Sequence, residues 1–249
     1  MYQTLLGLVL RVTEYNDRDV LLTLLTKEHG RITVKARGAR RKNSPLAVSC
    51  QLLVLSEFTL FEYRDMYVVN DAHVKEMFQG LRLDICKLAL ATYMVQVVDL
   101  ISQEDSPSMQ LQPLILNCLY AMSSLNLPND KVKAVFELRC ACLAGFMPDL
   151  GDELPANFEN VFFDISDGCF VFGNEGRFLS GGIRMPISAG IAEAMRYICY
   201  CDPKRIFGFD LNDDAMAGLS QITEAYLATQ LEQGFSSLDF YKSLFVSFT

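Results

Sequence analysis

A β-hairpin is predicted by the residues Val20-Leu-Leu-Thr-Leu-Leu-Thr26-Lys-Glu-His-Gly30-Arg-Ile-Thr-Val-Lys-Ala-Arg37. In the first half, Val20, Leu22 and Leu24 alternate with Leu21, Thr23 and Leu25. The second half alternates basic with apolar residues, as a strand does when one face lies in a core and the other in solvent. The connection at 27–30 is short, and Gly30 can adopt the positive φ that a tight turn needs. The second strand is expected to present its apolar residues to the core and its basic residues to solvent.

Three more strand-like segments surround this hairpin. Residues 5–12 precede it, and residues 51–63 and 66–74 follow it, the last two being joined by an Arg64-Asp65 turn. Five short strands, expected to be antiparallel, within about 75 residues favour a small barrel such as an OB-fold. The N-terminal part of the chain is therefore predicted to be a five-stranded OB-fold β-barrel.

The apolar pattern changes near residue 80 from the period of strands to that of helices. The expected helices are 81–101, 113–125, 130–146, 186–200 and 219–233, with an irregular hairpin at 161–179. Asp130 is the expected N-cap of the third helix, and Gly145 and Pro148 mark its end. The predicted class is α+β with two domains: an OB-fold nucleic-acid-binding domain at 1–79 and an all-helical domain at 80–249, with a hairpin insert at about 151–182.

Charge is distributed unevenly between these two parts of the chain, whose total net charge is −8. Residues 1–80 contain 11 Lys and Arg against 9 Asp and Glu, a net of +2. Residues 81–249 contain 11 against 21, a net of −10. This division suggests two domains with different tasks, the first suited to an anionic partner.

The positive charge is concentrated in one segment. Six basic residues and no acidic one occur from position 31 to position 42: Arg31, Lys35, Arg37, Arg40, Arg41 and Lys42. A basic patch on an acidic protein is typical of a site for a polyanion, most often nucleic acid, although a solvated strand face beside a basic loop gives the same pattern. If all six contact single-stranded phosphates, the log–log slope of binding against salt should be about −4.

Composition and motifs argue against a membrane protein and against an enzyme. The longest apolar run, 88–101, is interrupted by polar residues on one helical face, so no membrane partner is expected. No secretion signal is visible, so the eight cysteines are expected to be reduced, buried thiols in a cytoplasmic protein. Only two histidines occur, and no phosphate loop, nucleophile elbow or zinc-protease motif is present, so no enzyme activity is expected.

Two Cys-x-Cys pairs, Cys140-Ala-Cys142 and Cys199-Tyr-Cys201, raise the question of a metal site. Residues two apart on a helix point about 200° away from each other, so one pair cannot bind a single ion unless the helix is broken. The second pair lies near a predicted helix end and is therefore the better candidate of the two. We expect core thiols at both pairs and no cofactor.

The sequence resembles the RecO family of bacterial recombination mediators over nearly its full length. At the N-terminus the resemblance is carried by residues 7–11, 19–30 and 34–41. In the helical part it is carried by Phe136-Glu-Leu-Arg139 and Leu143-Ala-Gly-Phe-Met-Pro-Asp-Leu150, and more loosely by residues 186–188 and 236–240. These segments follow one another in the order and at the spacing of the family.

This resemblance implies an N-terminal OB-fold, a C-terminal helical domain and a DNA-repair protein that is not an enzyme. Such a protein binds single-stranded and double-stranded DNA and anneals complementary strands. It works with RecR to place RecA on DNA coated by single-stranded DNA-binding protein, whose acidic, hydrophobic C-terminal tail docks on the helical domain. The implied location is the cytoplasm, at the nucleoid.

Particular residues can be assigned to these implied contacts. The six basic residues would bind phosphates, and Tyr63 and Tyr67 are candidates for base stacking, although each also suits core or turn packing. An acidic tail would need a cationic rim, because the helical domain is itself negative. The available donors for that rim are Lys131, Lys133, Arg139, Arg196, Lys204 and Arg205.

Two departures from the family pattern affect the expected sites. Many members bind zinc with two Cys-x-x-Cys pairs that follow the segment matching Asp149-Leu150, whereas here only Cys169 lies between residues 150 and 186. One thiol cannot complete a four-ligand site, so we expect a zinc-less insert. The aromatic residues expected to hold it together are Phe158, Phe162, Phe163, Phe170 and Phe172. Basic residues that many members have near 234–237 are absent, so the N-terminal patch is expected to carry more of the DNA binding.

Two other functions remain open on these residues. A general OB-fold binder of single-stranded DNA or RNA would bind nucleic acid without any dependence on RecR. A purely protein-binding scaffold would use the basic strand to recognise an acidic peptide and would ignore DNA at moderate salt.

Overall fold

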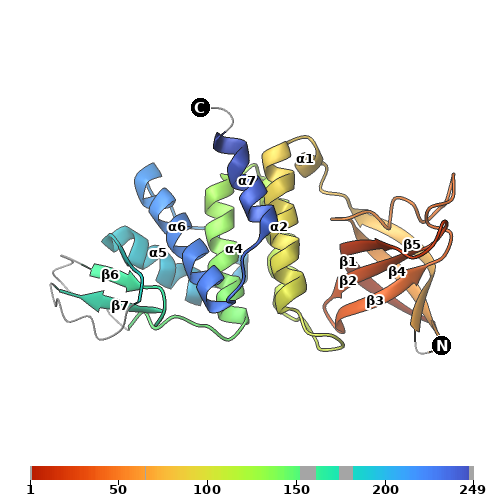
Figure 1. Ribbon diagram of the computed structural model, residues 1–249, viewed down its shortest axis with the longest axis horizontal. Helices are drawn as coiled ribbons and strands as arrows, with labels where there is room; N and C mark the ends of the chain where they lie inside the picture. Colours follow the sequence, from red (N-terminus) through yellow and green to blue (C-terminus); the bar gives the residue numbers. More distant parts are fainter. Residues whose placement is uncertain (1, 65, 152–160, 174–181, 247–249) are drawn as a thin grey trace. The chain divides into compact units, whose positions relative to one another are not determined.

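The computed structural model describes residues 2–64, 66–151, 161–173 and 182–246, and its contacts divide the chain into two compact units (Figure 1). Unit 1 comprises Met1–Asn126 and Phe235–Thr249, and unit 2 comprises Leu127–Gly234. The last helix of the chain therefore groups with the N-terminal barrel. The predicted domain boundary near residue 80 marks a different division, the one between strands and helices.

The N-terminal barrel in unit 1 is closed by five strands (Figure 1, red to orange). The strands are β1 (Tyr2–Glu14), β2 (Val20–Thr26), β3 (Gly30–Ala36), β4 (Leu55–Tyr63) and β5 (Met66–Glu76). Their order around the barrel is β1-β2-β3-β5-β4, and β4 returns to β1. The predicted OB-fold β-barrel is confirmed by this closed arrangement.

One seam of the barrel differs from the prediction of antiparallel strands. Strand β3 pairs with β5 in parallel, with Val34 opposite Tyr67 and Lys35 opposite Val68. The chain can close a five-stranded barrel this way because residues 37–54 form a long turn-rich connection between β3 and β4. The parallel seam brings the end of β3 beside the start of β5, which matters for the site described below.

The barrel core explains why these segments become strands. Alternate residues of the hairpin point inward, among them Leu22, Leu24, Ile32 and Val34, each with 2% exposure or less. The connection 37–54 adds further side chains to this core, so β4 begins at Leu55 and not at residue 51 as predicted.

The tight turn between β2 and β3 depends on Gly30. This residue has a φ of +62°, and a Cβ atom there would lie 1.9 Å from the carbonyl oxygen of Ser106. The close approach joins the hairpin to the segment that follows Ile101, and the backbone N–H of Arg31 donates to the carbonyl of Gln103 at 3.1 Å. The positive φ expected of Gly30 is thus confirmed, and the space around it also requires glycine.

Four helices complete unit 1. They are α1 (Gln79–Arg82), α2 (Ile85–Ile101), α3 (Leu111–Ser123) and α7 (Ser236–Val246). The single helix predicted over 81–101 is wrong, because the Asp84 carboxylate accepts the backbone N–H groups of Cys86 and Lys87 and so starts a new helix. Helix α7, which no predicted helix covers, packs against α2, and the ring of Phe235 beside it lies edge-on to Tyr93 at 5.4 Å.

Unit 2 is built on helices α4, α5 and α6. Their bounds are Asn129–Leu143, Ala189–Tyr200 and Asp213–Gln230, and a short 3₁₀ helix covers Pro203–Arg205. Helix α4 ends at Leu143, three residues before the predicted end, and Gly145 follows it with a φ of +98°; its N-cap is Pro128 and not Asp130. Likewise, α5 begins at the Ser188 cap and not at Pro186, because the Ser188 hydroxyl accepts the N–H of Ile191.

A small antiparallel sheet in unit 2 has the strand order β7-β6-β8. Its strands are β6 (Val161–Asp164), β7 (Cys169–Phe172) and β8 (Arg184–Pro186). The fully buried ring of Phe163 lies edge-on to Phe170 at 6.1 Å and to Tyr226 of α6 at 5.3 Å, whereas Phe172 is exposed. Phe158, also expected to hold this insert together, lies outside the described residues.

None of the helices in the described residues is both long enough and apolar enough to span a membrane.

Candidate nucleic-acid interface

The six predicted cations follow one another on β3 and on the loop after it, but the structure does not give them one environment. Along β3, Arg31 and Lys35 point away from the core formed by their neighbours Ile32 and Val34. Arg37, Arg40, Arg41 and Lys42 lie in the turns that follow the strand. Their partners sort the six into three groups.

Arg31 is held by helix α2. Its Nη1 donates to the main-chain carbonyl of Asp99 at 2.7 Å and lies 3.4 Å from the Asp99 carboxylate. The same carboxylate lies 3.5 Å from Nη2 of Arg11. The Arg31 side chain is only 29% exposed. Arg31 therefore joins two elements of unit 1, and its charge is largely satisfied inside the protein.

Lys35 is held by the loop between β1 and β2. Its Nζ lies 3.2 Å from the Asp19 carboxylate and 4.1 Å from the centre of the Tyr15 ring. The other oxygen of Asp19 accepts the N–H of Gly38 at 2.9 Å. That backbone hydrogen bond is the largest of the effects that lower the pKa of Asp19, and Lys35 adds to it. Lys35 and Asp19 thus form an ion pair that fixes the start of the basic loop.

Arg40 is held less firmly. Its Nη1 lies 2.9 Å from the carboxylate of Glu14 and donates to the main-chain carbonyl of Asn16 at 3.1 Å. Because Glu14 is 72% exposed, this ion pair is solvated and contributes little stability. A phosphate could replace the carboxylate at low cost.

Arg37, Arg41 and Lys42 form the third group, whose side chains are exposed. Within the described part of the chain, no carboxylate lies within 4.0 Å of their charged nitrogens. The Arg37 guanidinium stands 5.5 Å from the centre of the Tyr63 ring. These three residues are the cations of the predicted site that remain available to an anion.

The turn between β4 and β5 adds one cation, Arg64, that was not predicted for the site. The Arg64 guanidinium lies 5.2 Å from the centre of the same Tyr63 ring, which is 47% exposed. Tyr67, the other stacking candidate, packs against the barrel core and is only partly accessible. We call Arg37, Arg41, Lys42, Tyr63 and Arg64 the outer cluster.

The parallel pairing of β3 with β5 is the reason that Arg64 belongs to the outer cluster. It places the end of β3 and the turn before β5 at one end of the barrel. A sequence-based prediction of parallel closure would have pointed to Arg64, whereas the linear run of charges could not. The outer cluster combines cations with an exposed aromatic face, the two elements that single-stranded nucleic acids require.

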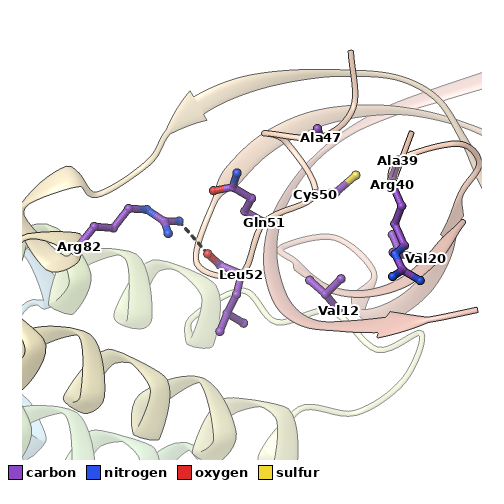
Figure 2. A pocket seen from close by; sticks show the side chains of 9 residues that line it. All are labelled: Val12, Val20, Ala39, Arg40, Ala47, Cys50, Gln51, Leu52 and Arg82. Carbon is purple, nitrogen blue, oxygen red and sulfur yellow. Dashed lines mark hydrogen bonds between the residues drawn. The ribbon is translucent and has the colours of Figure 1, made fainter. Parts of the chain in front are cut away.

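A pocket of about 460 Å³ lies beside the basic loop within unit 1, as Figure 2 shows. Arg40 stands at one end of it and Arg82 at the other, where its guanidinium donates to the carbonyl of Leu52 at 2.9 Å. Between them lie apolar side chains and the thiol of Cys50, whose pKa is raised to about 12 by burial. A thiol that stays protonated is a poor nucleophile. None of the nine lining residues is a carboxylate or a histidine, so this pocket offers no acid or base for catalysis.

The described residues contain no group of three or more His, Cys, Asp or Glu side chains arranged to hold a metal ion. Cys169, the one cysteine of the insert, has its pKa raised by burial and by nearby carboxylates. The absence of zinc stays a prediction.

Comparison with known proteins gives a consistent result along the whole chain. The models for Recombination protein O N terminal and Recombination protein O C terminal match residues 1–78 and 82–239. DNA repair protein RecO of Acetivibrio thermocellus is 30% identical over 241 residues, which are 96% of this chain and 95% of that protein. DNA repair protein RecO of Symbiobacterium thermophilum is 28% identical over 96% of both chains, and that of Bacillus subtilis is 27% identical over 88% of this chain and 86% of its own. The chain therefore belongs to the RecO family of DNA repair and recombination proteins.

Proposed function

We propose that this RecO-family chain is a recombination mediator that binds single-stranded DNA and anneals complementary strands. We further propose that, with RecR, it helps to load RecA onto DNA coated by single-stranded DNA-binding protein. The observation that carries the proposal is the outer cluster on the barrel. It supplies cations that no carboxylate of the described residues neutralises, next to an exposed aromatic ring.

The chemistry of the outer cluster suits a nucleic acid backbone. Arg37, Arg41, Lys42 and Arg64 would contact phosphates, and the Tyr63 ring would stack on a base. No recognition helix takes part, so binding is expected to be independent of sequence and to extend to the phosphates of double-stranded DNA. Neutralised phosphates also repel a second strand less, which would favour annealing.

Salt dependence tests this site directly. Four accessible cations predict a log–log slope of about −3 on single-stranded DNA, so affinity should fall about fifty-fold between about 50 and 200 mM salt. The variant R37A/R41A/K42A should lose about 2 units of slope. The variant K27A/K204A/R205A removes the same amount of charge elsewhere and should keep the slope of the wild type. Equal effects of the two variants would show that only net charge matters and would contradict the assigned site.

The acidic tail of single-stranded DNA-binding protein is proposed to dock on unit 2. Four of the six candidate rim residues already have partners, Arg196 among them. Lys133 is buried against Glu137, the Arg139 guanidinium binds main-chain carbonyls, and Lys131 pairs with Asp210. Lys204 and Arg205, on the 3₁₀ helix after α5, are exposed. We therefore assign the cationic rim to Lys204 and Arg205.

A fluorescent peptide with the sequence of that tail, titrated against the full chain at low salt, tests this assignment. K204A/R205A should weaken peptide binding at least about fivefold, because the variant removes the positive charge that attracts the acidic tail. This attraction is strongest at low salt, where it is least screened. R37A/R41A/K42A should bind the peptide as the wild type does. No binding of the peptide to the wild-type chain would disprove the tail site while leaving the DNA site standing.

Mediation itself distinguishes the proposal from its rivals. The full chain should accelerate assembly of RecA on DNA coated by single-stranded DNA-binding protein only when RecR is present. DNA binding without any RecR dependence would identify a general OB-fold binder. Failure to bind DNA at moderate salt would identify a protein-binding scaffold.

A further inference from the structure

The two Cys-x-Cys pairs, which were expected to be separate core thiols, meet in unit 2. The sulfur of Cys142, near the end of α4, lies 3.8 Å from the sulfur of Cys199, near the end of α5. Cys199 is 3% exposed, whereas Cys142 is only partly buried. Two thiols on different helices are thus held side by side, with one of them less buried than the other.

A fixed positive charge accompanies this pair. The Arg139 guanidinium, which lies one helical turn before Cys142 on α4, donates to the carbonyls of Cys199 at 2.7 Å and of Cys201 at 3.2 Å. These bonds occupy two main-chain acceptors at the end of α5 and hold the guanidinium beside the thiols. Cations close to a cysteine favour its thiolate, which is the reactive form.

The two thiols differ in acidity in a way that assigns their roles. The hydrogen bond between the two thiols lowers the pKa of Cys142, and the charge of Arg139 lowers it further against the effect of burial. The same hydrogen bond and burial raise the pKa of Cys199. Burial also raises the pKa of Cys50 and of Cys118 elsewhere in the chain. Cys142, which is the less buried of the two thiols and has the lowered pKa, is therefore the nucleophile of the pair.

We propose that Cys142 and Cys199 form a dithiol that hydroperoxides oxidise to a disulfide, which joins α4 to α5. The inference is independent of the DNA-binding proposal. The sulfur atoms need to approach each other by less than about 2 Å to reach disulfide distance, and rotation of the two side chains can supply that movement. The bridge would close a segment of the chain that contains the small sheet and nearly all of α5.

The chemistry balances with hydrogen peroxide as the oxidant. The Cys142 thiolate attacks one peroxide oxygen, so that an S–O bond forms and the O–O bond breaks. The departing hydroxide takes up the proton that Cys142 released and becomes water. The Cys199 sulfur then attacks the Cys142 sulfenic acid, so that the S–S bond forms and the S–O bond breaks. The hydroxyl leaves with the Cys199 proton as a second water, and the two electrons lost by the thiols have reduced the peroxide.

Exposure of the full chain to hydrogen peroxide, followed by denaturation, alkylation and mass analysis, tests the proposal. The eight thiols of the sequence should fall to six, and peptide mapping should find the bond between Cys142 and Cys199. The variant C142S should lose thiols about tenfold more slowly than the wild type, because the thiolate is gone. The variant C199S should accumulate a Cys142 sulfenic acid that dimedone traps.

C201S is the matched control. It removes the neighbouring thiol of the same Cys-x-Cys pair but keeps the main-chain carbonyl that Arg139 binds. It should form the bridge at the rate of the wild type. A bond that maps to another pair of cysteines, or thiol loss in C142S as fast as in the wild type, would overturn the proposal. If C142S does not fold, mapping of the wild-type bond decides the question without it.

Discussion

The guanidinium of Arg31 donates a 2.7 Å hydrogen bond to the main-chain carbonyl of Asp99 and so joins strand β3 to helix α2 within unit 1. The most N-terminal member of the basic run is thereby a structural residue. Arg37, six positions later, has an exposed side chain on the same run. Stability and DNA affinity should therefore respond to different residues of one segment.

Arg31→Ala should separate these two roles. It removes a charge-assisted hydrogen bond from a mostly buried group, so the free energy of unfolding should fall by about 1–3 kcal/mol. The salt slope of DNA binding should stay unchanged. Arg37→Ala is the matched control, and it should lower the slope by about 0.7 and leave stability within about 0.5 kcal/mol. Denaturant titration and salt-dependent binding measure both quantities, and a loss of slope in R31A like that in R37A would contradict the division.

Gly30→Ala should be among the most damaging single substitutions in unit 1. Its added Cβ would lie 1.9 Å from the Ser106 carbonyl oxygen, at a φ that side chains rarely adopt. We expect unfolding to become easier by more than about 3 kcal/mol, as measured in urea. Gly145→Ala provides the control, because its φ is also positive but nothing lies within 4 Å of the added atom. Backbone strain without a clash should cost only about 1 kcal/mol.

Asp19→Asn should change how stability depends on pH. The pKa of Asp19 is lowered in the folded chain, chiefly by the N–H of Gly38. A carboxyl with a lowered pKa stabilises the fold above its ordinary pKa, and this stabilisation is lost as the pH falls through the lowered value. Between about pH 5 and pH 2, D19N should therefore show a shallower decline in melting temperature than the wild type. Asp17→Asn, an exposed residue of the same loop, should decline as the wild type does.

The buried ion pair of α4 should show strong coupling between its members. Lys133, 3% exposed, lies 3.0 Å from the carboxylate of fully buried Glu137 and 2.8 Å from that of Glu224 on α6. Lys133→Met would remove the cation that lies between the Glu137 and Glu224 carboxylates and should cost about 3–5 kcal/mol of stability in urea unfolding. The double variant K133M/E137L removes the buried charge and should recover most of this loss. A double variant less stable than K133M would refute this account of the pair.

Zinc analysis tests the prediction made for the insert. The sequence places only Cys169 between residues 150 and 186, so the isolated protein should contain no stoichiometric zinc. A chelator should leave the melting temperature unchanged, since a structural zinc contributes directly to folding. One zinc per chain by elemental analysis would contradict this and would direct attention to the two Cys-x-Cys pairs.

The barrel was predictable from sequence because its signals are local. The alternation in Val20–Thr26 and the positive φ at Gly30 depend on neighbouring residues. Val20, Leu22 and Leu24 lie in the barrel core and Gly30 has a positive φ, but Thr23 and Leu25 on the opposite face of the strand are buried as well. The start of α2 was missed because, in the sequence, Asp84 looks like one polar residue within an apolar helix. Its role as an N-cap is visible only in the hydrogen bonds that its side chain accepts in the structure. The start of α5 was likewise placed at Pro186 by the prediction, whereas the Ser188 side chain caps the helix in the structure.

The candidate site was predicted less fully because charge pairing is not local. Arg31 binds Asp99, which lies 68 positions later in the sequence, so the residues near Arg31 give no indication of this partner. Arg64 joins the site only through the parallel seam of the barrel, which alternation of residues cannot reveal. Where several basic residues occur together, sequence identifies the segment, whereas the carboxylates around it decide which of them remain available.

The return of the chain to unit 1 at Phe235 has a consequence for limited proteolysis. Unit 2 has a covalent connection at each of its ends, near residues 126 and 234. One cut near residue 126 leaves unit 2 covalently joined only to the α7 segment, and one cut near residue 234 leaves it joined only to residues 1–126. After either cut, only the packing of α7 against α2 still holds the two parts of unit 1 together. Release of unit 2 takes two cuts, and it also detaches the α7 segment from residues 1–126. That nicked unit 1 would then be a two-chain complex, in which a synthetic α7 peptide could be exchanged against the original one on the α2 surface.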